Sequence, residues 1–274
     1  MSQPVALLTD FGLADPYLAQ MKGVLLSLNR DVTIIDISHQ VQPFNPVQAG
    51  FLLNASREFF PKGTIFVAVV DPGVGGDRRI VVLEKFGQVF MAPDNGLLSL
   101  VLEARGRARV YDVTRPSGLS AASATFHGRD VFAPVAAHLS KGGAVQEVGP
   151  EIPLDSLLCL PLAEPVWVQT SQVKEISASV LHVDRFGNCL LNLFIDPWLA
   201  RIQSWPGLFL VHPEERPVVL VKNYARLPEK TLGLLAGSQG VLELCLDRAS
   251  AAKALGLEAG HAVRLSCSPG TSGP

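Results

Sequence analysis

Apolar and polar positions along the first half of the chain alternate in the manner of strands followed by helices. Apolar runs at 4–11, 32–38 and 63–71 predict buried strands. Apolar residues recur at steps of three and four over 16–29 and 46–59, which predicts helices. Strands that alternate with helices indicate a mostly parallel sheet with helices on both faces.

The same patterns predict further elements in this half. The run 79–93 is typical of two strands joined by a turn at Gly87, and 95–104 predicts a short helix. Residues 131–142 predict another helix, with Pro134 in its first turn and a glycine just after its end. The first half is therefore expected to form a Rossmann-like α/β domain.

The pattern changes near residues 161–169, where short apolar runs at close spacing begin. Strands are predicted at 176–184, 189–194, 208–212, 217–225, 231–237, 240–247 and 262–267. One helix is predicted at 250–257. Many short strands without intervening helices are typical of a small barrel or sandwich. We therefore predict an α/β N-terminal domain over 1–164 and a smaller, all-β, barrel-like C-terminal domain over 165–274.

The composition narrows the class of protein. Of 274 residues, 48% are hydrophobic and 18% charged, so the chain can bury a large core. The formal net charge of -2 gives no electrostatic reason to bind nucleic acid or an anionic membrane. No apolar run approaches the roughly 20 residues of a membrane span, and the first residues lack the pattern of a secretory signal. Four cysteines without a C-x-x-C pair favour reduced thiols. We expect a cytoplasmic globular protein.

Several acidic residues follow predicted strands. Asp10, Asp36, Asp71 and Asp94 lie at or near strand ends. Ligands of open parallel sheets bind beyond the carboxyl ends of the strands, although a single Asp there is more often a helix cap or turn residue. Asp10 and Asp71 each precede a glycine closely, and a carboxylate is suited to the vicinal diol of a ribose. These two acids are candidate ligand-binding residues.

The stretch "VVDPGVGGDRR" at 69–79 joins Asp71 to two arginines through a turn with three glycines. One interpretation is a tight turn with solvated charges. The other is a small-molecule site in which Asp71 and an arginine fold back toward each other. Residue types alone do not distinguish Arg78 from Arg79.

A histidine and two clusters in the second half are further candidates. His127 lies in "TFHGRD" beside Gly128 and before a predicted helix, which suits a general base or an orienting group. A metal-binding role is disfavoured because no second histidine lies at ligand spacing. The stretch "DRFGN" at 184–188 predicts either a bulged hairpin or a purine pocket. The glycine-rich "AGSQGVLEL" at 236–244 is a weaker ligand-binding pattern.

Six motifs occur together in order: "LLTDFG", "VVDPGVGGDRR", "APDNG", "TFHGRD", "DRFGN", and "GSQG" followed by "LE". With these motifs the chain resembles the S-adenosylmethionine (SAM) hydroxide adenosyltransferases, or SAM hydrolases, which are related to fluorinases and chlorinases. The resemblance covers nearly the whole chain. It implies cleavage of SAM to adenosine and L-methionine by water-derived hydroxide at the ribose C5′. It also implies no cofactor, an α/β domain followed by a β-barrel domain, and homotrimers with active sites between subunits.

The resemblance also implies roles for individual residues. Asp71, Arg78 and His127 match the water-activating trio. The resemblance implies that Asp71 also contacts the substrate. The other substrate-binding positions that it implies are Asp10 at the ribose, Phe44 at an aromatic wall, Asn188 at the adenine, Asp184 and Ser238 at the methionine end, and Glu243 and the Leu246 backbone. In halide-using relatives, the positions of Asp71 and His127 carry other residues and a serine replaces Gly128. That difference favours water over halide, and no metal is expected.

Three alternatives remain open at the level of sequence. The first is halide-directed adenosyl transfer, as in the chlorinases and fluorinases. The second is a metal-dependent phosphohydrolase that uses Asp10, Asp71, Asp94 and His127. The third is a module that binds SAM or a nucleoside without turning it over. The presence of Asp71, Arg78 and His127 together favours the hydrolase.

Overall fold

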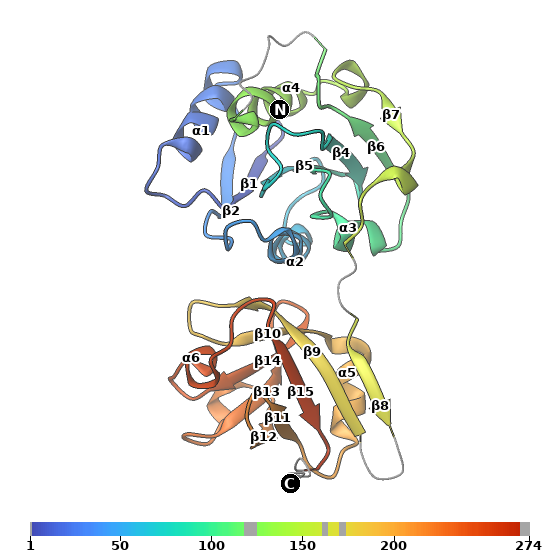
Figure 1. The fold of residues 1–274 in the computed structure, drawn as a ribbon. Coiled ribbons are helices and arrows are strands. Elements are labelled where there is room, and N and C mark those ends of the chain that lie inside the picture. The colour runs from blue at the N-terminus through green and yellow to red at the C-terminus, as the bar shows by residue number, and fades with distance from the viewer. Residues whose placement is uncertain (1, 118–124, 161–163, 170–173, 269–274) are drawn as a thin grey trace. The chain divides into compact units, whose positions relative to one another are not determined.

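The protein forms two compact units, each with its own hydrophobic core (Figure 1). The computed structural model describes residues 2–117, 125–160, 164–169 and 174–268. The first unit comprises Met1–Leu160 and the second Pro161–Pro274. Each unit is described by itself below.

A seven-stranded sheet forms the centre of the described part of the first unit. Its strands are β1 (Val5–Thr9), β2 (Ile34–Ser38), β3 (Ile65–Val69), β4 (Ile80–Lys85), β5 (Gln88–Pro93), β6 (Ala108–Asp112) and β7 (Glu151–Ile152). Their order is β2-β1-β3-β5-β4-β6-β7. β2, β1, β3 and β5 are mutually parallel, whereas β4 runs antiparallel to both of its neighbours. The predicted, mostly parallel sheet is confirmed.

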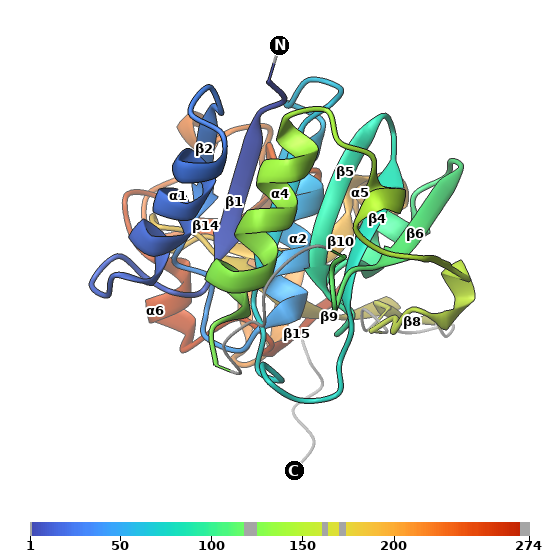
Figure 2. The same ribbon diagram turned by 90° about the horizontal axis from the view of Figure 1, so that it is seen from above.

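Helices cover both faces of this sheet (Figures 1 and 2). The helical segments are α1 (Tyr17–Leu28), α2 (Pro46–Arg57), α3 (Ser99–Glu103), the π-helical turn η1 (Gly128–Phe132), α4 (Ala133–Ser140), and the 3-10 turns η2 (Val145–Glu147) and η3 (Leu154–Ser156). α1 packs beside α4, and α2 beside α3. Val5 and Leu7 of β1 face one core cluster, and Ala6 and Leu8 face the other. Burial on both faces explains why the central strands are almost entirely apolar.

The second unit is a closed β-barrel. Its strands are β8 (Val166–Gln169), β9 (Lys174–Val183), β10 (Cys189–Phe194), β11 (Phe209–His212), β12 (Arg216–Leu220), β13 (Leu232–Ala236), β14 (Val241–Leu246) and β15 (Ala262–Ser266). They follow the order β10-β14-β13-β12-β11-β15-β9-β8, and the pairing of β10 with β9 closes the barrel. β8 pairs with β9 outside the closed ring. The barrel alternative of the sequence prediction is therefore confirmed.

In the described part of the second unit, three helical segments accompany the barrel: α5 (Ile195–Gln203), the 3-10 turn η4 (Tyr224–Arg226) and α6 (Ala251–Leu255). Trp198 and Ile202 of α5 pack into the barrel core. Cys189 and Cys245 are buried thiols, and burial raises the pKa of each to about 12. Cys159 is exposed, so not every thiol lies in a core. None of the helices in the described ranges combines the length and apolarity that a membrane span needs.

Candidate active site

Two of the predicted acids leave the sheet at the same edge. The parallel register pairs Thr9 with Val69, so Asp10 and Asp71 both lie just beyond the carboxyl ends of neighbouring strands. Asp10 Oδ2 accepts a hydrogen bond from the Phe44 backbone N–H at 3.0 Å. Burial raises the pKa of Asp10, and the nearby negative charge of Asp71 raises it further. The fold therefore places two carboxylates where ligands of such sheets bind.

Arg78 joins Asp71 to His127. Its Nε lies 2.9 Å from each Asp71 oxygen, and its Nη2 also donates to Asp71 Oδ2. The same Nη2 lies 2.8 Å from His127 Nδ1. The side chains of Arg78 and Asp71 are only 10% and 5% exposed. Their burial contradicts the interpretation of 69–79 as a turn with solvated charges.

The contact with Arg78 determines the state of His127. A guanidinium can only donate, so Nδ1 of His127 accepts and the proton of the neutral ring lies on Nε2. Burial lowers the pKa of His127 and the charge of Arg78 lowers it further, while Asp71 and Asp130 oppose this shift. Within the described residues, the buried Nη1 of Arg78 has no acceptor. The cluster thus presents one neutral imidazole and one donor without a partner.

The backbone around His127 is held by close packing. His127 precedes the π-helical turn η1, and the first residue of that turn, Gly128, is buried. A Cβ atom at Gly128 would lie 3.0 Å from the Met21 sulfur and 3.0 Å from the Phe126 ring. Phe126 also makes an edge-to-face contact with Phe11, with ring centroids 5.8 Å apart. A larger residue than glycine at position 128 would require these neighbours to move.

A chain of polar contacts through the buried Thr9 and His39 supports the backbone on either side of Asp10. Thr9 Oγ1 lies 2.9 Å from His39 Nδ1, and His39 Nε2 lies 3.1 Å from Asp36 Oδ1. Thr9 Oγ1 also accepts the Phe11 N–H at 3.3 Å, and the His39 carbonyl accepts the Gly12 N–H at 2.7 Å. Sequence reasoning missed Thr9 and His39. No spacing signal identified them, because their contact depends on the pairing of β1 with β2.

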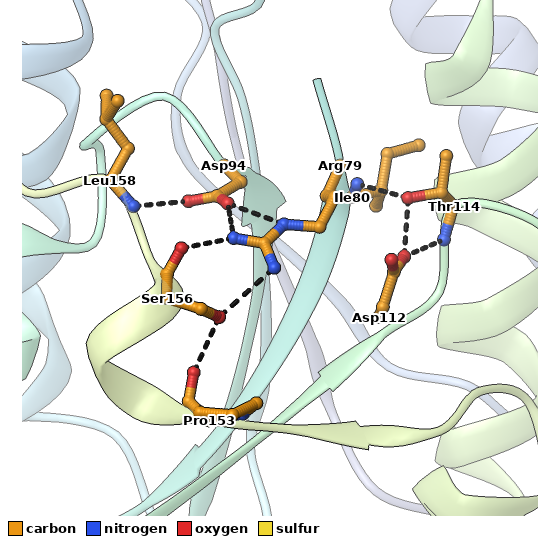
Figure 3. A network of polar contacts seen from close by, with 8 residues as sticks. All are labelled: Arg79, Ile80, Asp94, Asp112, Thr114, Pro153, Ser156 and Leu158. Carbon is orange, nitrogen blue, oxygen red and sulfur yellow. Dashed lines mark hydrogen bonds and ion pairs between the residues drawn. The ribbon is translucent and has the colours of Figure 1, made fainter. Parts of the chain in front are cut away.

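Arg79 and Asp94 form a separate pair. Asp94 Oδ2 accepts from Arg79 Nε at 2.9 Å and from Nη2 at 2.6 Å, and Arg79 Nη1 lies 3.1 Å from Ser156 Oγ (Figure 3). The structure therefore distinguishes the two arginines: Arg78 binds Asp71 and His127, whereas Arg79 binds Asp94. In the described ranges, no group of three His, Cys, Asp or Glu side chains is arranged to hold a metal ion.

The second unit contains its own polar cluster around the turn between β9 and β10. Asp184 Oδ1 accepts the backbone N–H groups of Phe186 and Asn188, each at 2.9 Å. Asn188 Nδ2 donates to Asp184 Oδ2 at 2.9 Å and lies 3.5 Å from the Tyr224 hydroxyl. Tyr224 in turn donates a short hydrogen bond to Glu243 Oε1. Four polar side chains from three segments thus form one network.

Burial changes the acidity of this network. It raises the pKa of Glu243, and the charge of Asp184 raises it further, while the hydrogen bond from Tyr224 opposes the shift. Burial and the contact with Glu243 raise the pKa of Tyr224. Sequence reasoning missed Tyr224, although "KNYAR" offers an aromatic hydroxyl next to turn residues.

The remaining predicted residues lie at the edges of these clusters. Ser238 is exposed in the turn between β13 and β14, next to Gly237, whose added Cβ would lie 2.6 Å from Glu243 Oε2. Leu246 ends β14 and is partly buried. Phe44 is 72% exposed and has a φ of 65°, which is unusual for a residue other than glycine. Its ring is therefore exposed while its backbone N–H binds Asp10.

A cavity of about 860 Å³ opens at a different place in the first unit. It lies between the β4–β5 turn and the segment before β6, at the opposite end of the sheet from Asp71, and its lining includes Lys85, Phe86 and Arg107. None of the predicted site residues lines it. We therefore assign the candidate active site to the cluster of Asp71, Arg78 and His127 at the strand ends, because its polar groups are paired and largely buried.

An α/β unit with a buried Asp–Arg–His cluster at its strand ends, followed by a closed barrel with a second polar network, defines a two-domain enzyme. The comparisons with known proteins give the family. The family described as "SAM hydroxide adenosyltransferase N-terminal domain" matches residues 5–149, and its C-terminal counterpart matches residues 178–264. The chain therefore belongs to the SAM hydroxide adenosyltransferase family.

Individual relatives agree with this assignment. The chain is 38% identical to the (R)-S-adenosyl-L-methionine hydrolase of Thermus thermophilus, over 96% of this chain and 99% of the relative. It is 35% identical to the hydrolase of the same name from Salinispora arenicola, over 95% and 97% of the two chains. A fluorinase from Actinopolyspora mzabensis is 27% identical over 96% and 97%. A crystal structure of an uncharacterized conserved protein from Thermotoga maritima has a TM-score of 0.86 at 33% identity, covering 95% of this chain and 99% of that one.

Proposed function

We propose that the protein hydrolyses S-adenosyl-L-methionine to adenosine and L-methionine. The observation that carries this proposal is the position of Arg78, which binds Asp71 and His127 at the same time in a buried cluster. Support also comes from the relatives named (R)-S-adenosyl-L-methionine hydrolase, which match nearly the whole chain.

The sulfonium is a good leaving group, so methionine leaves without protonation and no general acid is needed. Hydroxide is scarce at neutral pH, so the site has to supply an activated water molecule. In the proposed reaction the oxygen of a water molecule bonds to the ribose C5′ as the C5′–S bond breaks, and the electron pair of that bond goes to sulfur. Arg78 stabilises the hydroxide by its charge, and its buried Nη1 donor gains an acceptor. Methionine departs as a neutral thioether, and the 5′-hydroxyl of adenosine carries the water oxygen.

The proton arrangement favours different roles for Asp71 and His127. His127 Nδ1 already accepts from Arg78, so its Nε2–H is available to orient the nucleophilic oxygen. The Asp71 carboxylate retains acceptor capacity and is the group proposed to take the water proton. In this proposal His127 orients the water and Asp71 accepts its proton, whereas the sequence left His127 as either a general base or an orienting group.

We propose that the other predicted residues bind the substrate. Asp10 would accept hydrogen bonds from the ribose diol, and the exposed Phe44 ring would form a wall of the site. The second unit would bind the remaining parts of SAM through the predicted residues Asp184, Asn188, Ser238, Glu243 and the Leu246 backbone. Their network through Tyr224 supports this grouping.

We also propose a homotrimer in which the strand-end cluster of one subunit is completed by the barrel cluster of a neighbouring subunit. The support for it is the family resemblance and the division of the predicted residues between two units. A cytoplasmic location is proposed because buried reduced thiols suit a reducing compartment. The reaction needs no cofactor, since the substrate itself carries the leaving group.

The function is tested by incubating the purified protein with SAM and separating the products by chromatography. The proposal predicts equal amounts of adenosine and L-methionine, with the same rate in EDTA. Loss of activity in EDTA that returns with a divalent metal would favour the phosphohydrolase alternative. SAM recovered intact after long incubation would favour a binding module.

Halide-directed transfer is the second candidate, because a fluorinase matches the chain over 96% of its length. The packing at Gly128 argues against it. The resemblance places a serine at this position in halide-using relatives, and here Met21 and Phe126 occupy the space that its side chain would need. Addition of chloride is therefore expected to yield no 5′-chloro-adenosine.

A further inference from the structure

Two consecutive arginines at the end of the 71–79 turn hold two different carboxylates. Arg78 binds Asp71, and Arg79 binds Asp94 (Figure 3 shows the second pair). Successive residues of an extended segment point to opposite sides, which explains how neighbours with the same side chain reach different partners. Their two partners follow β3 and β5, which are adjacent parallel strands.

The Arg79–Asp94 pair is well anchored. The antiparallel register of β4 and β5 pairs Ile80 with Pro93, and the Asp94 N–H donates to the Arg79 carbonyl at 2.9 Å. On the other side, the Ile80 N–H donates to Thr114 Oγ1 at 2.9 Å (Figure 3). The Asp94 side chain is 8% exposed. The residue directly after Arg78 is therefore fixed by both side-chain and backbone contacts.

The start of the 71–79 turn is held by Asn95, the residue that follows Asp94. Asn95 Nδ2 donates to the Val70 carbonyl at 2.8 Å, one residue before Asp71. Asp94 and Asn95 thus anchor the residue after Arg78 and the residue before Asp71. Between these anchors lie three glycines, which restrict the backbone least of all residues. Inside the turn the backbone hydrogen bonds are from Val74 N–H to the Asp71 carbonyl at 3.3 Å and from Gly76 N–H to the Gly73 carbonyl at 3.0 Å, and the anchors add contacts at both of its ends.

We propose that Arg79 and Asp94 are positioning residues for the hydrolysis, which act through the backbone to hold Arg78 against Asp71 and His127. This inference rests on the proposed function for its catalytic consequence. Its structural content, that the Arg79–Asp94 pair sets the Arg78–His127 contact, stands independently of the substrate.

A purely structural role is the competing interpretation. Arg79 donates to the Ser156 carbonyl and hydroxyl, and Asp94 Oδ1 accepts the Leu158 N–H at 2.9 Å, so the pair also holds the end of η3 and the segment after it. If that were its whole contribution, loss of Arg79 would lower thermal stability and leave the turnover of folded protein unchanged. A positioning role changes kcat in folded protein.

The experiment compares wild-type protein with Arg79→Met, Arg79→Lys and Arg109→Met. Arg109 is a matched control because it pairs with Glu84 across β6 and β4 of the same sheet, with 2.9 Å between Nη2 and Oε2. We expect Arg79→Met to lower kcat by about 100-fold, the size of effect that a small misplacement in an active site produces, with KM nearly unchanged. Arg79→Lys should restore part of this loss, and Arg109→Met should leave kcat as in the wild type.

A measurement without substrate separates this proposal from the proposed function. The pKa of His127, measured by NMR, is lowered by burial of the ring and then by the charge of Arg78, while Asp71 and Asp130 raise it. In Arg79→Met it should rise toward the ordinary value of about 6.5, because Arg78 no longer holds Nδ1. In Arg109→Met it should not change. Far-UV circular dichroism confirms folding, and Arg79→Lys provides the comparison if Arg79→Met does not fold.

The outcomes distinguish the two claims. Wild-type protein that releases no adenosine refutes the proposed function, and the His127 measurement then decides the positioning claim alone. An unchanged His127 pKa in the Arg79 variants overturns the positioning claim whatever the turnover. A kcat of the folded Arg79 variants equal to that of Arg109→Met overturns it as well.

Discussion

Arg78 and Arg79 are neighbours with identical side chains, yet only one of them contacts His127 in this structure. Residue types did not distinguish them, because the direction of each side chain is set by the strand that follows. The presence of Asp71, Arg78 and His127 in one cluster was predictable from the order of motifs. Their hydrogen bonds, and the tautomer of His127 that these impose, required coordinates.

The proposed roles of two carboxylates predict different kinetic effects. Asp71→Asn should lower kcat by at least about 100-fold, because the amide cannot accept the water proton. Asp10→Asn should instead raise KM, since charged hydrogen bonds to the ribose diol of about 1.5–3 kcal/mol are lost. Steady-state kinetics on both variants check this. Equal loss of kcat in the two variants would contradict the division of roles.

The state of His127 predicts the acid limb of the pH profile. The neutral ring is the form that accepts from Arg78, and burial and Arg78 hold its pKa below the usual range. Activity should therefore persist as the pH falls through about 6.5 and decline only below it. The midpoint of the acid limb of kcat against pH measures this. A midpoint above 6.5 would show that the working form of His127 is different.

At the scale of elements, sequence patterns predicted most strands and helices because burial imposes their periodicity. α5 was missed, although Trp198 and Ile202 lie four residues apart on its buried face. The π-helical turn η1 was also missed, since its backbone depends on the packing of Gly128 against Met21 and Phe126. Strands β6, β7 and β8 were not predicted either. The elements that escaped prediction therefore include three short strands, the nine-residue α5 and a turn that depends on tertiary contacts.

Glycines with positive φ in two turns of the second unit lead to a prediction about stability. Gly187 lies in the turn between β9 and β10, and Gly240 lies in the turn between β13 and β14. Gly187 has a φ of 87°, and a Cβ there would lie 2.1 Å from Ser250 Oγ. Gly240 has a φ of 81° with open space around its Cβ position. Gly240→Ala should cost about 1–2 kcal/mol from backbone strain alone, and Gly187→Ala should cost more because the clash adds to it.

Urea unfolding of the two variants makes this comparison. The order of their unfolding free energies is the decisive result. If the Gly187→Ala variant is as stable as Gly240→Ala, the prediction is wrong, because Ser250 would then move away from the new Cβ atom without lowering the free energy of unfolding.

At the scale of the whole molecule, the predicted binding residues are divided between two units that each have their own core. The fold class of each unit could be predicted from periodicity. Periodicity could not predict whether residues of the two units contribute to one site, because no local pattern encodes contacts between separate units or subunits.

The proposed trimer predicts complementation between inactive variants. We expect Asp71→Asn to inactivate the strand-end cluster, and Glu243→Gln to inactivate the barrel cluster by removing the carboxylate charge next to Tyr224. If each site combines clusters from two subunits, refolding the two variants together should produce some sites with both clusters intact and recover activity. Light scattering should give three times the chain mass. A mixture as inactive as either variant alone would place both clusters of each site in one chain.

The central claim is that the cluster of Asp71, Arg78 and His127 directs water to the ribose C5′. Turnover of SAM in ¹⁸O-labelled water, followed by mass spectrometry of the adenosine, measures this directly. The account predicts one heavy oxygen in the 5′-hydroxyl for each turnover, and at least about 100-fold slower formation of labelled adenosine with Asp71→Asn. Adenosine without the label, or a product with another group at C5′, would contradict it.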